Sequence, residues 1–244
     1  MIQIQRVYDR SQQEGFRVLV DRLWPRGVRK EALALDAWCP EIAPSGELRR
    51  WFSHRHERWP YFQLLYRFEL FFHELGKEEE AGYWLRKLRD LACEKTLVLL
   101  YAAADDSKNN AVVLRDWLLR PPPDLSGILD EIIGQSSLQS VSLYRMLEQE
   151  PALLASSGVL EVSEEQLEAV RWACGQKKAL IVPAEIFQDE SDLGCMAEIG
   201  SELVQPSPSG NLAIHALLDH PGRPDPLLLQ FFEIWADLLD RCIR

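Results

Sequence analysis

The sequence predicts an α/β fold: a small parallel-type sheet flanked by helices in the first domain, and a mostly helical second domain with a short strand component. Two uninterrupted apolar runs, Val18–Val20 and Thr96–Tyr101, have the composition of buried strands. A polar loop follows each run, and the second loop leads into a helical pattern, which is the strand–loop–helix order of α/β proteins. Three consecutive prolines at 121–123 then interrupt the chain.

These prolines predict a domain boundary, because they cannot continue a helix and favour a stiff, extended linker. We expect an α/β domain over residues 1–120, a linker at 121–123 and an acidic module over 124–244. Charge agrees with this division: residues 1–120 hold 20 Lys and Arg against 18 Asp and Glu, and the remainder holds 7 against 20. The acidic surplus disfavours nucleic-acid binding by the whole chain, because it repels phosphates.

In the first 120 residues, alternating apolar positions predict a strand at 3–8, and the two apolar runs predict further strands. Residues 27–34 fit a loop with a short helical turn, and 38–42 fit no single element. Ser45 is a helix cap, Pro60 fits the first turn of the next helix, and Gly76 ends it. Two more helices are expected at 78–92, with Tyr83, Leu85, Leu88 and Leu91 on the apolar side, and at 111–119.

Helical patterns dominate the acidic half. We expect helices over 125–133, 142–154, 163–173 and 226–243, a short strand over 178–183 and a loop over 205–211. Ser163 and Gln166 form a capping-box signature at the start of the third of these helices. The helix Pro226–Ile243 is strongly apolar, so it is interpreted as core, with an interface as the alternative.

Several function classes receive no support. No apolar run approaches the roughly 20 residues of a membrane helix, and the amino terminus lacks the apolar core of a signal peptide, so we expect a cytoplasmic protein. The five cysteines are dispersed, which favours reduced thiols. His54 and His56 are two positions apart and would not share a helix face, so no metal site is expected. No glycine-rich cofactor loop is present, and the cofactor stays unknown.

Charged and amide side chains follow both predicted buried strands. Asp21, Arg22 and Arg26 surround Trp24 after the first, and the loop after the second carries further candidates: Tyr101, Asp105, Asn109 and Asn110. Ligands of open parallel sheets bind at the carboxyl ends of the strands, so a shared crevice is expected here. Guanidinium groups bind phosphate or carboxylate in two-pronged fashion, and a carboxylate accepts from hydroxyls or acts as a base.

Each candidate also has a structural interpretation. Asp21 could form an internal ion pair with Arg22 or Arg26 that fixes the following turn. Asn109 or Asn110 could cap the next helix. The tryptophans at 24, 51 and 59 could be core rather than stacking platforms. His54, near Ser45 and Arg49, is either an acid or base for catalysis or an ordinary surface histidine.

Four separated blocks carry a family resemblance: RVYD, RVLVDRLWPRG, APSGELRRWFSHRHERWPYFQLLYRFEL and LLYAAADDSKNNAVVL, in this order. Over about residues 4–119 they resemble the YeaO-like branch of bacterial domain-of-unknown-function family 488. The resemblance implies a small cytoplasmic α/β protein and brings no established activity. It ends at the prolines, and no resemblance is recognised in residues 124–244.

The resemblance also marks individual positions. They are Arg6, Tyr8, Asp21, Arg22, Trp24, Pro25, Arg26, Gly27, Ser45, Leu48, Arg49, Trp51, Phe52, His54, Trp59, Tyr101, Asp105, Asn109 and Asn110. Two positions depart from the family pattern: Ala104 stands where relatives usually have Lys or Arg, and Lys108 where they often have His. If the basic side chain serves chemistry, this chain is a binding-only or weakened version.

We therefore expect a crevice that binds, and could act on, a small anionic or nucleotide-like ligand. The catalytic candidates are Asp21, Arg22, Arg26, Asp105 and His54. The ligand-binding candidates are Arg6, Tyr8, Trp24, Ser45, Arg49, Tyr101, Asn109 and Asn110. The alternative is a non-catalytic interaction protein whose acidic second domain binds a partner, or a second copy of the chain through the helix Pro226–Ile243.

Overall fold

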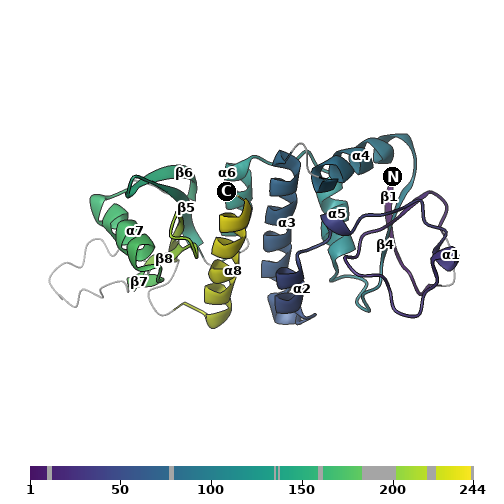
Figure 1. The fold of residues 1–244 in the computed structure, drawn as a ribbon, viewed down its shortest axis with the longest axis horizontal. Coiled ribbons are helices and arrows are strands. Elements are labelled where there is room, and N and C mark those ends of the chain that lie inside the picture. Colours follow the sequence, from purple (N-terminus) through teal and green to yellow (C-terminus); the bar gives the residue numbers. More distant parts are fainter. Residues whose placement is uncertain are drawn as a thin grey trace, which may run out of the picture. The chain divides into compact units, whose positions relative to one another are not determined.

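The structure is a computed structural model. It describes residues 1–9, 13–76, 80–134, 136, 138–158, 162–182, 202–218 and 224–242. Contacts between residues divide the chain into two compact units, Met1–Pro123 and Asp124–Arg244. Figure 1 shows the elements of both units.

The first unit is built on a four-stranded sheet with the order β1-β4-β2-β3. Its strands are β1 (Ile2–Arg6), β2 (Phe16–Leu19), β3 (Ala37–Trp38) and β4 (Leu97–Tyr101). All pairings are parallel, and β2 runs beside β4 with Val18 opposite Leu99. The central strand β4 is buried along its whole length, which explains its uninterrupted apolar sequence. The predicted parallel sheet and the α/β class are confirmed.

The helices of the first unit begin close to their predicted capping residues. They are α1 (Lys30–Leu33), the 3-10 turns η1 (Pro40–Ile42) and η2 (His56–Arg58), α2 (Gly46–Phe52), α3 (Trp59–Leu75), α4 (Glu80–Glu94) and α5 (Asn110–Leu118). Ser45 Oγ accepts a hydrogen bond from the Leu48 N–H at 3.1 Å, and Asn109 Oδ1 accepts one from the Val112 N–H at 3.2 Å. Positions 78 and 79, where the third helix was expected to begin, lie outside the described residues.

The sheet of the first unit is packed against helices and against apolar side chains of the neighbouring loops. Helix α5 contacts β1 and β4, and α4 also contacts β4. A separate cluster joins buried side chains of β2 and β4 to partly buried ones from the neighbouring loops: Val7, Leu19, Trp24, Leu35, Val98 and Leu100. The loop after β2, which carries the site candidates, is therefore anchored on the sheet by its own apolar residues.

One side-chain prediction in α4 is wrong. Tyr83 was expected on the apolar side, but it is 51% exposed, and the buried residues of this helix are Ala81, Gly82, Leu85 and Leu88. A Cβ at Gly82 would lie 2.4 Å from the His73 carbonyl oxygen, so the glycine allows α4 to approach the end of α3 closely.

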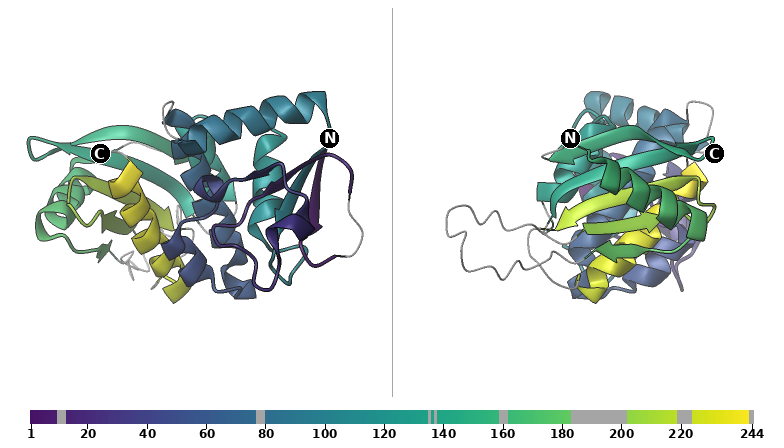
Figure 2. Two further views of the ribbon diagram at one scale, coloured as in Figure 1. Left: turned by 45° about the vertical axis from the view of Figure 1, so that its right-hand side comes forward. Right: turned by 90° about the vertical axis from the view of Figure 1, so that its left-hand side faces the viewer.

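The second unit contains a five-stranded antiparallel sheet with the order β6-β5-β9-β8-β7. Its elements are α6 (Leu125–Gly134), β5 (Leu138–Leu147), β6 (Glu150–Gly158), α7 (Glu164–Gln176), β7 (Leu180–Val182), β8 (Glu202–Pro206), β9 (Leu212–Leu218) and α8 (Pro226–Cys242). Helices α7 and α8 lie on opposite faces of this sheet (Figures 1 and 2). The capping box of Ser163 and Gln166 at the start of α7 is confirmed.

The helix predicted over 142–154 is wrong, because these residues form most of the β5–β6 hairpin. Its two-residue loop consists of Glu148 and Gln149, whose φ angles are 51° and 74°. Tight hairpin loops of this kind usually carry Asn-Gly or another glycine-containing pair, so the sequence lacked the ordinary hairpin signal. The strand β9 had not been predicted, and β8 extends to Pro206, inside the expected loop 205–211.

Helix α8 contacts β8 and β9, and its large side chains Phe231, Phe232 and Trp235 are buried. This agrees with the interpretation of the helix as core. Its use as an interface for a second copy stays a prediction. None of the helices in the described parts of the chain is long and apolar enough to cross a bilayer.

Candidate functional site

The carboxyl ends of β2 and β4 are joined by two hydrogen bonds. Asp21 Oδ2 accepts from the Ala102 N–H at 2.7 Å, and Asn110 Nδ2 donates to the Val20 carbonyl oxygen at 2.8 Å. Residues about 80 to 90 positions apart therefore meet at one edge of the sheet. The predicted adjacency of the two strand ends is present in the structure.

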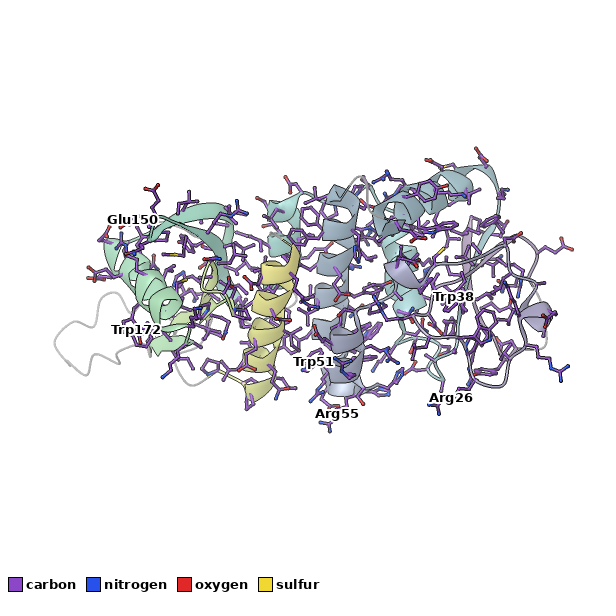
Figure 3. All side chains as sticks on the ribbon, in the orientation of Figure 1. Arg26, Trp38, Trp51, Arg55, Glu150 and Trp172 are labelled. Atoms are coloured by element: carbon purple, nitrogen blue, oxygen red, sulfur yellow. The ribbon has the colours of Figure 1, made fainter. Side chains whose placement is uncertain are left out.

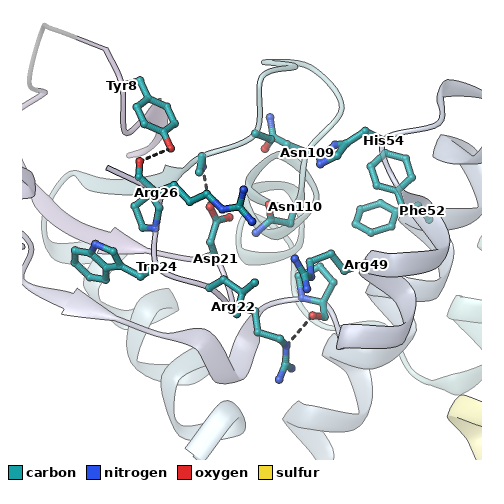
Figure 4. Close-up of a pocket in the computed structure, with 16 residues that line it drawn as sticks. Tyr8, Asp21, Arg22, Trp24, Arg26, Arg49, Phe52, His54, Asn109 and Asn110 are labelled. Atoms are coloured by element: carbon teal, nitrogen blue, oxygen red, sulfur yellow. Dashed lines mark hydrogen bonds between the residues drawn. The ribbon is translucent and has the colours of Figure 1, made fainter. Parts of the chain in front are cut away.

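A pocket of about 390 Å³ opens at this edge (Figure 4). It is lined by Tyr8, Asp21, Arg22, Leu23, Trp24, Pro25, Arg26, Pro44, Arg49, Phe52, His54, Phe62, Ala102, Ala103, Asn109 and Asn110. The volume lies within the range of about 300–1,000 Å³ that small-molecule sites occupy.

Asp21 is the carboxylate of the pocket. Burial raises its pKa above the ordinary value, and this effect outweighs the hydrogen bonds from Ala102 and Asn110 and the nearby charges of Arg49 and His54, which lower the pKa. No ion pair joins Asp21 to a cation within the described residues, so the internal ion pair with Arg22 or Arg26 has no support. The carboxylate is held by neutral donors instead.

The three arginines of the pocket differ in their partners. The Arg22 guanidinium donates to backbone carbonyl oxygens, to Pro44 at 3.0 Å from Nε and to Ala43 at 3.4 Å from Nη2. This contact anchors the segment before α2. Arg26 and Arg49 are exposed, and neither guanidinium has a hydrogen-bond or ion-pair partner in the described part of the chain. Their charge is therefore available to a ligand.

Figure 4 shows where these two guanidinium groups come from. Arg26 extends from the loop after β2 and Arg49 from α2, and both reach toward the space around Asp21 and Asn110. In Figure 3 the Arg26 side chain projects from the surface of the first unit, as expected for a group at the rim of a pocket.

The opposite wall of the pocket is aromatic. Phe52 stacks on Phe62 with ring centroids 4.3 Å apart, and the His54 ring lies 5.5 Å from Phe52. Ser53 and His54 have φ angles of 43° and 54°, a left-handed conformation that is uncommon for residues other than glycine. This conformation ends α2 and turns His54 toward the pocket (Figure 4). His54 thus lies in the turn after α2.

Other predicted residues line the pocket but also fix its loops. The Tyr8 hydroxyl donates to the Arg26 carbonyl oxygen at 3.2 Å, and Trp24 Nε1 donates to the Val28 carbonyl oxygen at 2.8 Å. Asn109 caps α5 and donates from Nδ2 to the Asp105 carbonyl oxygen at 2.9 Å. These contacts hold the strand-end loops in place.

Four candidates do not line this pocket. Arg6 lies over the ring of Tyr8, with its guanidinium carbon 5.1 Å from the centroid. Ser45 caps α2 and donates its N–H to Glu69 Oε2 at 3.0 Å. Tyr101 is 3% exposed at the end of β4, and burial raises the pKa of its hydroxyl.

The fourth, Asp105, lines an adjacent hollow together with His56 and Lys108. Its Oδ1 accepts hydrogen bonds from the Ser107 hydroxyl at 2.8 Å and from the backbone N–H groups of Ser107 and Lys108 at 2.9 and 3.0 Å. The Ser107 hydrogen bonds are the main cause that holds the pKa of Asp105 below its ordinary value.

Seven lining residues were not among the predicted site residues: Leu23, Pro25, Pro44, Phe52, Phe62, Ala102 and Ala103. A signal existed for Phe52, which the family resemblance marks, whereas Phe62 looked like an ordinary apolar position of α3. The alanines enter the site through their backbone at the end of β4, which side-chain chemistry does not indicate. No group of three or more His, Cys, Asp or Glu within the described residues could hold a metal ion.

Comparison with known families gives a match that covers the first unit. Residues 1–124 match the family DUF488-N3i, described as the "Inactive DUF488-N3 subclade". The chain belongs to this family. The resemblance to YeaO-like proteins of family 488 is thereby confirmed.

Two relatives are similar over 118 residues. The chain is 45% identical to "Uncharacterized protein YeaO" of Escherichia coli (strain K12), an alignment that covers 48% of this chain and 96% of YeaO. It is 36% identical to "Uncharacterized protein Rv3073c" of Mycobacterium tuberculosis (strain ATCC 25618 / H37Rv), with 48% of this chain and 92% of that protein covered. These relatives consist of little more than the matched region.

Solved structures give only weak likenesses. A free methionine-R-sulfoxide reductase from Neisseria meningitidis aligns with a TM-score of 0.38 and 17% identity, over 48% of this chain and 74% of that one. A structure titled "STRUCTURE OF THE GAF DOMAIN" aligns with a TM-score of 0.37 and 20% identity, over 48% and 72%. TM-scores this low support no conclusion about this chain.

Proposed function

We propose that the first unit binds a small anionic, nucleotide-like ligand in the pocket at the ends of β2 and β4. The observation that carries the proposal is the pair of exposed guanidinium groups, Arg26 and Arg49, which have no hydrogen-bond or ion-pair partner in the described residues and line a pocket of ligand size. Unpaired guanidinium groups bind phosphate or carboxylate strongly and with defined geometry.

The other lining groups suit the remaining parts of such a ligand. Besides its hydrogen bonds from Ala102 and Asn110, the Asp21 carboxylate has further lone pairs that can accept from hydroxyl donors such as those of a sugar. The Phe52 and His54 rings offer an aromatic wall for a planar group. The amino end of α5, which contributes Asn109 and Asn110 to the pocket, favours negative charge through the helix dipole.

We propose binding without turnover as the role of this chain. The family description "Inactive" agrees with this proposal. The contacts of Arg22 and Asn109 favour structural roles for both residues, which leaves few free groups for acid–base chemistry. The cytoplasm remains the expected compartment.

The test is a thermal-shift and calorimetric titration of the full chain with AMP, ribose 5-phosphate and inorganic phosphate. Arg49→Ala is expected to weaken AMP binding about tenfold or more, since a charge-assisted hydrogen bond contributes roughly 1.5–3 kcal/mol. Arg50→Ala is the matched control, because Arg50 is its exposed neighbour on α2 and does not line the pocket.

Arg26→Ala is expected to have a similar effect, with Arg29→Ala as its control in the same loop. The proposal would be contradicted if none of the three compounds bound the wild type. It would also fail if the control variants lowered AMP affinity as much as the pocket variants, because the effect would then come from net charge alone.

A further inference from the structure

A second hollow lies beside the pocket and shares a wall with it. Phe52, His54, Ala102 and Ala103 line both spaces. The second hollow has a volume of about 480 Å³ and adds Ala104, His56, Asp105 and Lys108 to the lining. Each hollow alone is of ligand size, and we call the two adjoining hollows the groove. A ligand that reached from one hollow into the other would be larger than a small anion such as phosphate.

The polar groups of the second hollow form a chain of contacts. Lys108 Nζ lies 3.0 Å from His56 Nδ1, and His56 Nε2 lies 3.6 Å from Asp105 Oδ2. Asp105 is fixed by three hydrogen bonds to its other oxygen. The carboxylate therefore orients the His56 ring from one side, and the ammonium group of Lys108 approaches the ring from the other.

The two ends of the groove carry different positively charged groups. Arg26 and Arg49 line only the first hollow, and Lys108 lines only the second, beside the imidazole of His56. Between them lies the shared wall, where the Phe52 ring is buried and the His54 ring is exposed. A ligand that filled the groove would need negative charge at both ends and a planar or sugar part in the middle.

We propose that the groove selects a nucleotide that carries anionic groups at two separate positions, such as a nucleoside bisphosphate. This inference rests on the proposed function, because it assigns the first anionic group to Arg26 and Arg49. Lys108 then binds the second anionic group, and His56, whose Nδ1 accepts from Lys108 and whose Nε2 faces Asp105, holds the lysine side chain in position.

The residue type at position 108 fits this assignment. A lysine is charged at all physiological pH values, whereas a histidine is charged only in part near neutral pH. Lys108 thus supplies a permanent positive charge at the second hollow.

The test compares adenosine 3′,5′-bisphosphate with AMP by calorimetry on the full chain. The wild type is expected to bind the bisphosphate about tenfold more tightly than AMP. The Lys108→Ala variant is expected to lose this preference and to keep the wild-type affinity for AMP. Lys30→Ala, which removes an exposed lysine that lines neither hollow, leaves both affinities unchanged.

The outcomes separate the two proposals. If AMP binds and Arg49→Ala weakens it, but the bisphosphate binds no more tightly than AMP, the second subsite is wrong and the proposed function stands. If Lys108→Ala weakens AMP and bisphosphate equally, the lysine acts on the first anionic group and the second subsite is again wrong. If neither compound binds, both proposals are overturned.

Discussion

Asp21 is placed in the pocket at a cost in stability. Burial raises the pKa of its carboxyl above the ordinary value of 3.8, so the folded state favours the protonated form more than the unfolded chain does. Below pH 3.8 the group is protonated in both states and no penalty arises. As the pH rises through the folded pKa, ionisation of the buried group lowers the free energy of unfolding.

Asp21→Asn is therefore expected to raise the melting temperature at pH 7 by about 2 °C, because the amide oxygen can still accept from Ala102 without a charge. The gain should shrink toward zero as the pH falls to 4. The same variant should bind AMP more weakly, since it lacks the carboxylate. Melting curves between pH 4 and 8 check the first point, and a variant less stable than the wild type at pH 7 would contradict it.

For the individual residues of the site, the residue types could be predicted from the sequence, but their roles could not. Asp21, Arg22 and Arg26 are close in sequence and chemically suited to a site, and all three line the pocket. The Arg22 guanidinium donates hydrogen bonds to the carbonyl oxygens of Ala43 and Pro44. This role depends on the position of a segment more than 20 residues further along the chain. Local sequence carries no information on such contacts.

Among the elements, those of the first unit were predictable because each carries its own signal. Strand β4 is a pure apolar run, α2 and α5 have side-chain caps, and α3 has a proline in its first turn. These signals agree with the tertiary structure, as expected where local and long-range preferences coincide. The β5–β6 hairpin had no such signal, since Glu148 and Gln149 form its loop against their conformational preferences.

The hairpin loop gives a stability prediction. Replacing Glu148 by Asn and Gln149 by Gly supplies the residues that tolerate positive φ, so the double variant is expected to raise the free energy of unfolding by about 1 kcal/mol. Urea denaturation of the full chain measures the change. Equal or lower stability would show that the loop carries no such strain.

For the whole molecule, the three prolines, the change in net charge and the two compact units all fall at the same place in the chain. The alignment with YeaO covers 96% of that protein and less than half of this chain. These observations support the proposal that residues 1–123 are an independent domain. The sequence indicated this boundary but not the antiparallel sheet beyond it, whose strands are paired across up to about 80 positions.

A protein consisting of residues 1–123 is therefore expected to fold by itself and to bind AMP with the affinity of the full chain, within about threefold. Circular dichroism during heating and calorimetry with AMP are the measurements. A truncated chain without a cooperative thermal transition would contradict the independence of the domain. A folded chain that has lost AMP binding would instead show that the second unit contributes to the site.

Ligand binding by the first unit depends above all on contacts of Arg26 and Arg49 with a bound anion. A crystal structure of the full chain grown with AMP tests this directly. The phosphate is expected between the two guanidinium groups, with nitrogen–oxygen distances of about 2.7–3.2 Å to both. A phosphate bound elsewhere on the chain, or guanidinium groups paired with protein carboxylates in the presence of AMP, would contradict it.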